Sequence, residues 1–279
     1  MKTVVQKKYI WFGPLIATVI TGCFLAAEMP FNNWDYPYQT YADGCLRLVI
    51  GFLALVVLRF IYKDEFKRLF CNRIPSKTWI YLIPFWASLV IYIVMFICAE
   101  EVSFALLPNF FVNWIIQITT GFWEEAVCRG IFMVGMLCFW KTSVRGRLFT
   151  IGIAGLFFGL IHFSSFFFGA SIDNALYSML FSGLWGAFIA AIYMQSENLL
   201  LVMLLHAIWD IIVRIPEFFV TVYPENSIIY YLDEILRLVV LPFVAIVVAL
   251  FAFEKRKVRI PYKSEFVERL NFSKTIHEK

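Results

Sequence analysis

Long apolar runs separated by short polar connections occupy most of this chain. Each run is about 17 to 28 residues long, which suits an α-helix that crosses a bilayer. The pattern therefore predicts an all-α fold, a polytopic membrane helix bundle with about eight transmembrane helices. We place these helices at residues 10–27, 44–62, 78–98, 110–137, 148–168, 175–193, 198–214 and 235–253.

Composition supports the same picture. Hydrophobic residues make up 61% of the chain, compared with about 45 to 50% in soluble domains. The apolar runs follow one another without a polar segment long enough for a separate soluble domain. We therefore expect residues 1–279 to form a single integral membrane domain in contact with the lipid bilayer.

Lysine and arginine residues gather in alternate connections of this pattern. They precede the first predicted span, follow the second and the fourth, and recur in a basic tail at 254–279, whereas the intervening loops carry Asp and Glu. Cytoplasmic loops are enriched in Lys and Arg, so both the N- and C-termini are expected to be cytoplasmic in the cell membrane. The basic tail then suits an anchor at the anionic leaflet, with no nucleic acid as a partner.

A small set of ionisable residues lies inside the apolar runs. Charge at membrane depth costs roughly 2.5 to 3.5 kcal/mol per residue on insertion scales, so such residues are kept mainly where they line a cavity and take part in chemistry. The set predicts one intramembrane active site. Its members are Glu124, Glu125, Arg129, His162, His206 and Asp210.

Spacing gives the first three residues different roles. Glu125 and Arg129 are four residues apart, so they can pair along one face of a helix. This leaves Glu124 as a carboxylate without a local partner, about 100° around the helix from Glu125, as suits a general base. The Glu125–Arg129 pair is also compatible with a purely structural ion pair between helices.

The two histidines inside predicted spans complete the set. His206 and Asp210 repeat the four-residue step, so the carboxylate can orient the imidazole or share a bound water or metal with it. His162 has no acid at helical spacing. It follows Gly155 and Gly159, whose GxxxG step is expected to bring this helix close to a neighbour.

The residues around these clusters carry a family resemblance. Residues 124–130 (EEAVCRG) resemble an EExxxRG motif, residues 158–162 (FGLIH) an FxxxH motif, and residues 206–210 (HAIWD) an HxxxN/D motif. Together and in this order they resemble the CPBP family of intramembrane proteases, the CAAX protease and bacteriocin-processing (Abi) proteins. The similarity covers about residues 110–214, the expected protease core.

This resemblance implies an intramembrane endopeptidase that hydrolyses a peptide bond of a peptide or membrane-protein substrate. By resemblance, Glu124 activates water, Glu125 and Arg129 support it, and His162 and His206 bind water or the oxyanion. Asp210 stands where eukaryotic members that cut prenylated proteins typically carry Asn, which puts that substrate in doubt.

The sequence leaves the role of a metal open. His162, His206 and Asp210 form a two-histidine, one-carboxylate set that could hold Zn²⁺ with an open position, as in a metalloprotease. The same residues also suit a metal-free glutamate site, and spacing does not choose between the two.

Two other function classes remain as alternatives. The first is a non-proteolytic membrane protein of the same fold, acting in immunity or as a scaffold, whose role would survive loss of Glu124. The second is a small transporter, which would require inverted repeats and broken helices at matching positions. Neither of those transporter features is evident in the chain.

Overall fold

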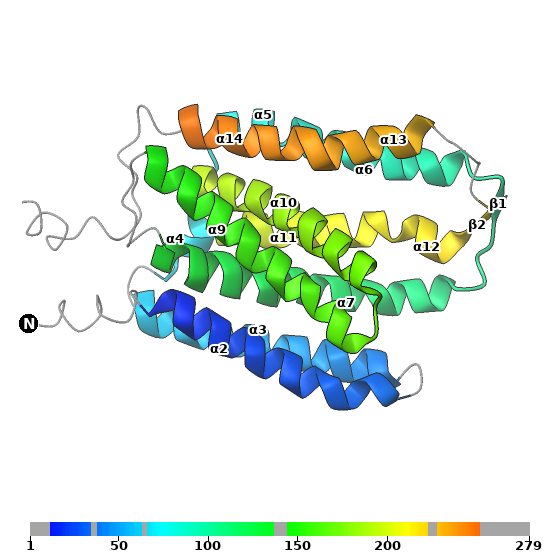
Figure 1. The fold of residues 1–279 in the computed structure, drawn as a ribbon, viewed down its shortest axis with the longest axis horizontal. Helices are drawn as coiled ribbons and strands as arrows, with labels where there is room; N and C mark the ends of the chain where they lie inside the picture. Colours follow the sequence, from blue (N-terminus) through cyan, green and yellow to red (C-terminus); the bar gives the residue numbers. More distant parts are fainter. Residues whose placement is uncertain (1–11, 35–37, 63–65, 137–143, 223–227, 252–279) are drawn as a thin grey trace, which may run out of the picture.

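The computed structural model describes residues 12–34, 38–62, 66–136, 144–222 and 228–251. Helices lying side by side make up nearly all of it (Figure 1). The α-helices are α2 (Gly13–Glu28), α3 (Tyr38–Tyr62), α4 (Arg68–Cys71), α5 (Ser76–Tyr81), α6 (Ile83–Ile97), α7 (Leu107–Glu125), α9 (Val144–Phe163), α10 (Ile172–Ser196), α11 (Leu199–Val213), α12 (Ile215–Phe219), α13 (Ile228–Ile235) and α14 (Leu241–Phe251).

Other elements extend or connect these helices. The 3₁₀-helices η1 (Met29–Asn33) and η4 (Ser164–Phe168) follow α2 and α9, and the π-helices η3 (Ala126–Met133) and η5 (Leu236–Val240) follow α7 and α13. Two short strands, β1 (Glu101–Val102) and β2 (Val220–Val222), pair antiparallel at one end of the bundle. The predicted all-α class is therefore confirmed, apart from this small pairing.

Five helices among the described residues qualify as membrane-span candidates by length and composition. They lie at Gly13–Phe31, Tyr38–Tyr62, Val144–Phe168, Ile172–Ser196 and Leu199–Phe219. Each predicted range overlaps a helix of the bundle, but α6 is shorter and the α7–η3 and α13–α14 stretches contain charged residues. The predicted count of about eight spans is not confirmed.

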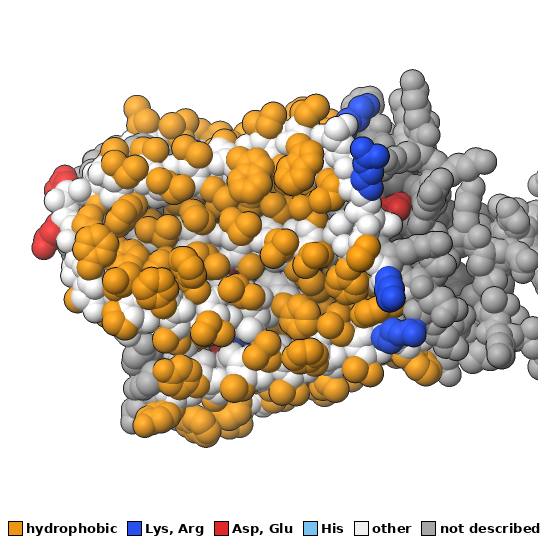
Figure 2. Space-filling view, turned by 180° about the vertical axis from the view of Figure 1, so that it is seen from behind, with side chains coloured by type: hydrophobic (Ala, Val, Ile, Leu, Met, Phe, Trp, Pro, Cys, Tyr) orange, Lys and Arg blue, Asp and Glu red, His pale blue; other side chains and the backbone are white. Residues whose placement is uncertain are grey.

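The outside of the bundle is apolar, as expected for an integral membrane protein. Figure 2 shows hydrophobic side chains over most of one face, with Lys and Arg gathered at one end of it. Exposed apolar residues occur along the helices, and examples are Val56, Ile115 and Leu180. This surface is suited to contact with lipid chains. The predicted basic tail at 254–279 lies outside the described residues.

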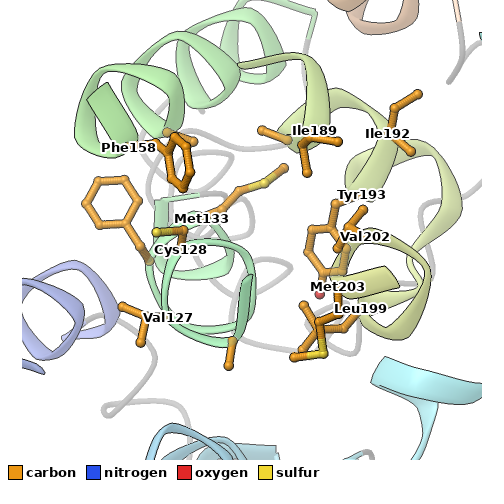
Figure 3. Packing of buried hydrophobic residues seen from close by; sticks show 14 of the residues in the cluster. Val127, Cys128, Met133, Phe158, Ile189, Ile192, Tyr193, Leu199, Val202 and Met203 are labelled. Carbon is orange, nitrogen blue, oxygen red and sulfur yellow. The ribbon is translucent and has the colours of Figure 1, made fainter. Parts of the chain in front are cut away.

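The buried core lies where η3, α10 and α11 meet. Figure 3 shows Met133, Ile189, Ile192, Leu199 and Val202 pointing toward one another from these elements. All of them are buried. Because the catalytic candidates lie on the same elements or directly beside them, this packing fixes the backbones that carry them.

The predicted close contact at the GxxxG step is confirmed. A Cβ atom added to Gly155 would lie 2.6 Å from the Gly183 carbonyl oxygen, and one added to Gly159 would lie 2.5 Å from the Met179 carbonyl oxygen. Side chains larger than hydrogen would therefore push α9 away from α10. The contact sets the position of His162, which lies one turn beyond Gly159 on α9.

We expect Gly159→Ala to destabilise the protein by about 1 to 3 kcal/mol, because the added methyl group overlaps the α10 backbone. Gly152→Ala on the same helix is the matched control, since a Cβ there meets no atom within 4 Å. Thermal unfolding of both variants in the same detergent measures the difference. Equal unfolding midpoints for the two variants would refute the tight contact.

The connection between α10 and α11 is fixed by reciprocal hydrogen bonds. Asn72 donates from Nδ2 to the Glu197 carbonyl oxygen (2.7 Å), and Asn198 donates from Nδ2 to the Asn72 carbonyl oxygen (2.9 Å). Asn198 also caps α11, because its Oδ1 accepts from the Leu201 amide at 2.9 Å. The start of α11 is thus held in place two turns before His206.

Candidate active site

Helices α7 and α11 approach closely beside the predicted catalytic residues. A Cβ atom added to Gly121 would lie 2.8 Å from both the Ala207 nitrogen and the Met203 carbonyl oxygen. The missing side chain lets the two backbones come close together. One turn after Gly121, Glu124 and Glu125 therefore face His206 on α11.

Glu125 joins residues from two helices. Its Oε1 accepts a hydrogen bond from Arg129 Nη1 at 2.7 Å and lies 2.8 Å from His206 Nδ1. All three side chains are buried. The sequence predicted the pair with Arg129, whereas the contact with His206 crosses between α7 and α11 and has no signature in spacing. By resemblance this pair supports Glu124, but in the structure its direct partner is His206.

Arg129 extends this network to a third helix. Its Nη2 donates to the Gly186 carbonyl oxygen on α10 at 2.9 Å, and its guanidinium lies 4.7 Å from the centre of the Phe158 ring. Arg129 lies in η3, and single π-helical turns are frequent at functional sites. The buried charge is thus compensated by a carboxylate, a carbonyl oxygen and an aromatic face.

The two ring nitrogens of His206 have different surroundings. Its Nδ1 is held by Glu125, while its Nε2 lies 3.4 Å from Asp210 Oδ2 and 3.7 Å from Glu124 Oε2. Both Nε2 distances exceed the usual range of about 2.7 to 3.2 Å for an N–H···O bond. Nε2 is therefore oriented toward the two carboxylates without being tightly bonded to either.

His162 is oriented by its own helix. Its Nδ1 lies 3.0 Å from the Phe158 carbonyl oxygen, one turn earlier on α9. A carbonyl oxygen can only accept, so Nδ1 carries the proton in this contact and Nε2 of the neutral ring has a free lone pair. The Phe158 ring contacts both histidines, with centroid distances of 4.6 Å to His162 and 5.7 Å to His206.

A cavity of about 760 Å³ brings these residues to a common space. Four of the predicted residues line it, namely Glu124, His162, His206 and Asp210. The other two, Glu125 and Arg129, are not among the lining residues and lie behind His206. The structure thus distinguishes the residues that can touch a substrate from the residues that keep those side chains in position. A cavity of this size can accommodate a peptide segment.

Glu124 has a specific place in the cavity wall. It is 5% exposed, and its Oε2 has no hydrogen-bond partner among the described residues. An unsatisfied buried carboxylate oxygen is costly and calls for an explanation. A water molecule or a substrate group in the cavity would satisfy it.

Sequence reasoning missed several polar residues of the cavity. Asn113, Gln117 and Thr120 line it from α7, at helical spacing before Glu124. With its amide turned so that nitrogen faces Asp210, Gln117 donates to Asp210 Oδ2 (3.2 Å) and accepts from Arg214 Nε (3.1 Å). The available signal was this polar stripe on an otherwise apolar span, with members at positions 113, 117, 120 and 124.

Arg47 is a second residue that sequence reasoning missed. It lies on α3, lines the cavity, and donates from Nε to Asp43 Oδ1 at 2.8 Å and from Nη1 to Thr120. Glu28 of α2 lies 3.6 Å from its Nη2. Helices α2 and α3 therefore contribute a charged wall opposite α11.

The predicted zinc ligands His162, His206 and Asp210 all line the cavity, but they are not grouped as a metal site. Among the described residues, which include His162, His206 and Asp210, no three His, Cys, Asp or Glu side chains are arranged to hold a metal ion. His206 directs Nδ1 to Glu125, and His162 directs Nδ1 to a backbone carbonyl. We therefore derive no chemical step through a metal at this site.

Comparison with known proteins identifies the family of the part that contains the site. Residues 81–212 match the model of the family described as type II CAAX prenyl endopeptidase Rce1-like. Neither the curated proteins nor the solved structures contain a match to the chain. The matched segment includes α7, α9, α10 and nearly all of α11, and all six predicted site residues fall within it. Residues 81–212 thus form a domain of the Rce1-like type II CAAX prenyl endopeptidase family.

Proposed function

We propose that this chain is an intramembrane endopeptidase in which Glu124 activates a water molecule. The family implies a protease, and five span-length helices imply that it works in the bilayer. The single observation that carries the mechanism is the position of Glu124. It is a buried carboxylate on a polar cavity wall, with one oxygen lacking a partner and His206 Nε2 at 3.7 Å.

In the proposed reaction, Glu124 accepts a proton from water as the water oxygen attacks the scissile carbonyl carbon. His162 positions the water through the free lone pair of its Nε2. His206, when protonated at Nε2, donates to the developing oxyanion. The tetrahedral intermediate then breaks at the C–N bond, and the proton held by Glu124 passes to the leaving amine.

Residues behind the cavity wall maintain this arrangement. Glu125 holds the His206 ring through Nδ1, and Arg129 holds Glu125 while anchoring to α10. Asp210 lies on the Nε2 side of His206, beside Gln117. Preorganised groups of this kind need little rearrangement during the reaction.

The appearance of new peptide termini distinguishes the proposed protease from the competing function, an immunity or scaffold protein of the same fold. Membranes of cells that express wild-type protein are compared by mass spectrometry of labelled N-termini with membranes of cells that express Glu124→Ala. A protease produces new termini only with the wild type. Identical sets of termini, together with an unchanged phenotype, would favour the scaffold function.

We expect proteolysis to continue after metal is removed, because each step above uses side chains of the chain alone. Purified protein is treated with a chelator, its metal content is checked by elemental analysis, and the cleavage rate is compared with that of untreated protein. Near-stoichiometric Zn²⁺ in the purified protein, with turnover lost on chelation and restored by Zn²⁺, would contradict this expectation.

A further inference from the structure

The two ends of the bundle carry opposite charge. Figure 2 shows Lys and Arg side chains gathered at one end of the apolar surface. This basic end is formed where α3 ends, where α5 and α9 begin, and between these elements (Figure 1). Its described basic residues are Arg59, Lys67, Arg73, Lys77, Arg145 and Arg147.

Acidic residues define the opposite end. It is formed by β1, β2, α12 and the first turn of α10 (Figure 1). Glu100, Glu101, Asp173 and Glu217 lie there, and the basic residue Arg214 at this end is paired with Glu217 at 3.1 Å. Because Lys and Arg are enriched on the cytoplasmic side of membrane proteins, we expect the basic end to face the cytoplasm and the acidic end to face the exterior.

The cavity extends from the middle of the bundle, at His206 and Trp185, toward the acidic end. Its lining residues come from the last turns of α2, the first half of α3, nearly the whole of α7 as far as Glu124, the last two turns of α9, and α11 from its midpoint at His206 to its end. From α10 the lining residues are Ser178, Phe181, Ser182 and Trp185, of which Trp185 lies just past the midpoint of the helix. No lining residue comes from α4, α5, η3 or α14, which adjoin the basic end.

The polar lining continues from the reaction centre to this end. Along α7 it runs from Glu124 through Thr120, Gln117 and Asn113 to Asn109, and Gln39 faces it from the start of α3. Asn109 and Gln39 are each within two residues of the acidic-end terminus of their helix. Polar side chains along the wall provide a path for water and for a peptide backbone.

We propose that the substrate is a peptide segment that reaches the site from the extracytoplasmic side, such as the outer part of an exported or membrane-anchored peptide. This proposal concerns the substrate of the same site, and it rests on the proposed protease function. The cavity extends toward the acidic end of the bundle, so a substrate enters from that end. The charge of the two ends assigns the acidic end to the outer side of the membrane. A cytosolic peptide would have to pass the closed, apolar core between η3, α10 and α11.

Thiol labelling tests the side of access without requiring activity. In a background that keeps only the buried Cys128, Gln39→Cys and Asn109→Cys each place one thiol at the proposed mouth. Lys77→Cys, exposed at the basic end, is the matched control. The probe is a membrane-impermeant sulfonated maleimide, applied to intact cells and to inverted membrane vesicles.

The expected result is labelling of both mouth positions in intact cells, and labelling of Lys77→Cys in inverted vesicles alone. Labelling of the mouth positions only from the cytoplasmic face would overturn the proposal, and so would absence of labelling from both faces. Modification of Gln39→Cys from outside is also expected to reduce the yield of new peptide termini. If no variant forms new termini at all, the proposed protease function fails, while the labelling still reports the side to which the cavity opens.

Discussion

Glu124→Gln is expected to lower the cleavage rate by about 10² to 10⁴-fold or more while leaving the protein folded in the membrane. The amide has nearly the same shape as the carboxylate but cannot accept a proton from water. Neither Asp210 nor Glu125 can replace it. Asp210 lies on another helix beside His206 Nε2, and Glu125 is engaged by Arg129 and His206 outside the cavity lining.

The measurement is the cleavage rate of a peptide that carries a site mapped with the wild-type protein, using purified variants in lipid nanodiscs. Glu217→Gln is the matched control, because Glu217 on α12 makes an exposed ion pair with Arg214 and does not line the cavity. We expect the control to cleave at the wild-type rate. Wild-type turnover by Glu124→Gln would remove the proposed mechanism.

Glu125→Gln should impair both folding and turnover. Removing one partner of a buried ion pair typically costs about 3 to 5 kcal/mol, because the remaining charge stays buried. Here the charge left behind is Arg129, which is 1% exposed. The same substitution removes the carboxylate that holds His206 Nδ1, so the oxyanion donor is also no longer oriented.

Unfolding and kinetics of the two glutamine variants separate these effects. Glu125→Gln is expected to unfold at clearly lower temperature or denaturant concentration than Glu124→Gln, although the residues are neighbours in sequence. A Glu125→Gln protein with wild-type stability would show that the network around Arg129 and His206 contributes little to the fold.

Contacts between candidate site residues could be predicted from the sequence where helical spacing relates the two residues. The four-residue steps from Glu125 to Arg129 and from His206 to Asp210 are contacts in the structure, at 2.7 Å and 3.4 Å. Spacing describes one helix at a time, however. The contact between Glu125 and His206 depends on the close approach of α7 and α11 at Gly121, which is a property of packing between segments far apart in the chain.

The predicted count of about eight spans is not confirmed, and the reason again lies in packing between segments of the chain. Hydropathy treats each apolar run as an independent crossing, whereas α7 buries a polar stripe inside the protein and α6 extends only from Ile83 to Ile97. The same stripe was visible in the sequence at positions 113, 117 and 120. The stripe was not predicted because only ionisable residues were taken as candidates, and its amide and hydroxyl side chains are not ionisable.

The π-helix after Glu125 could not be predicted either. Residues 126–133 contain no proline that would mark a change of helical turn, and α2, α3, α9 and α11 all pack against them. Tyr62 of α3 donates to the Gly130 carbonyl oxygen at 2.9 Å, and a Cβ on Gly130 would lie 2.9 Å from Leu58. These contacts come from residues about 70 positions earlier in the chain.

Chemical rescue of Glu124→Ala by formate tests directly whether the Glu124 carboxylate is the base that activates water. Truncation removes the proposed base and leaves space beside the cavity into which a small carboxylate fits. We expect Glu124→Ala to be inactive alone and formate to restore part of its cleavage rate in a saturable manner. Formate should not rescue Glu124→Gln, because the amide fills the space. Cleavage by Glu124→Ala at the wild-type rate without formate would contradict the role of Glu124 as the base.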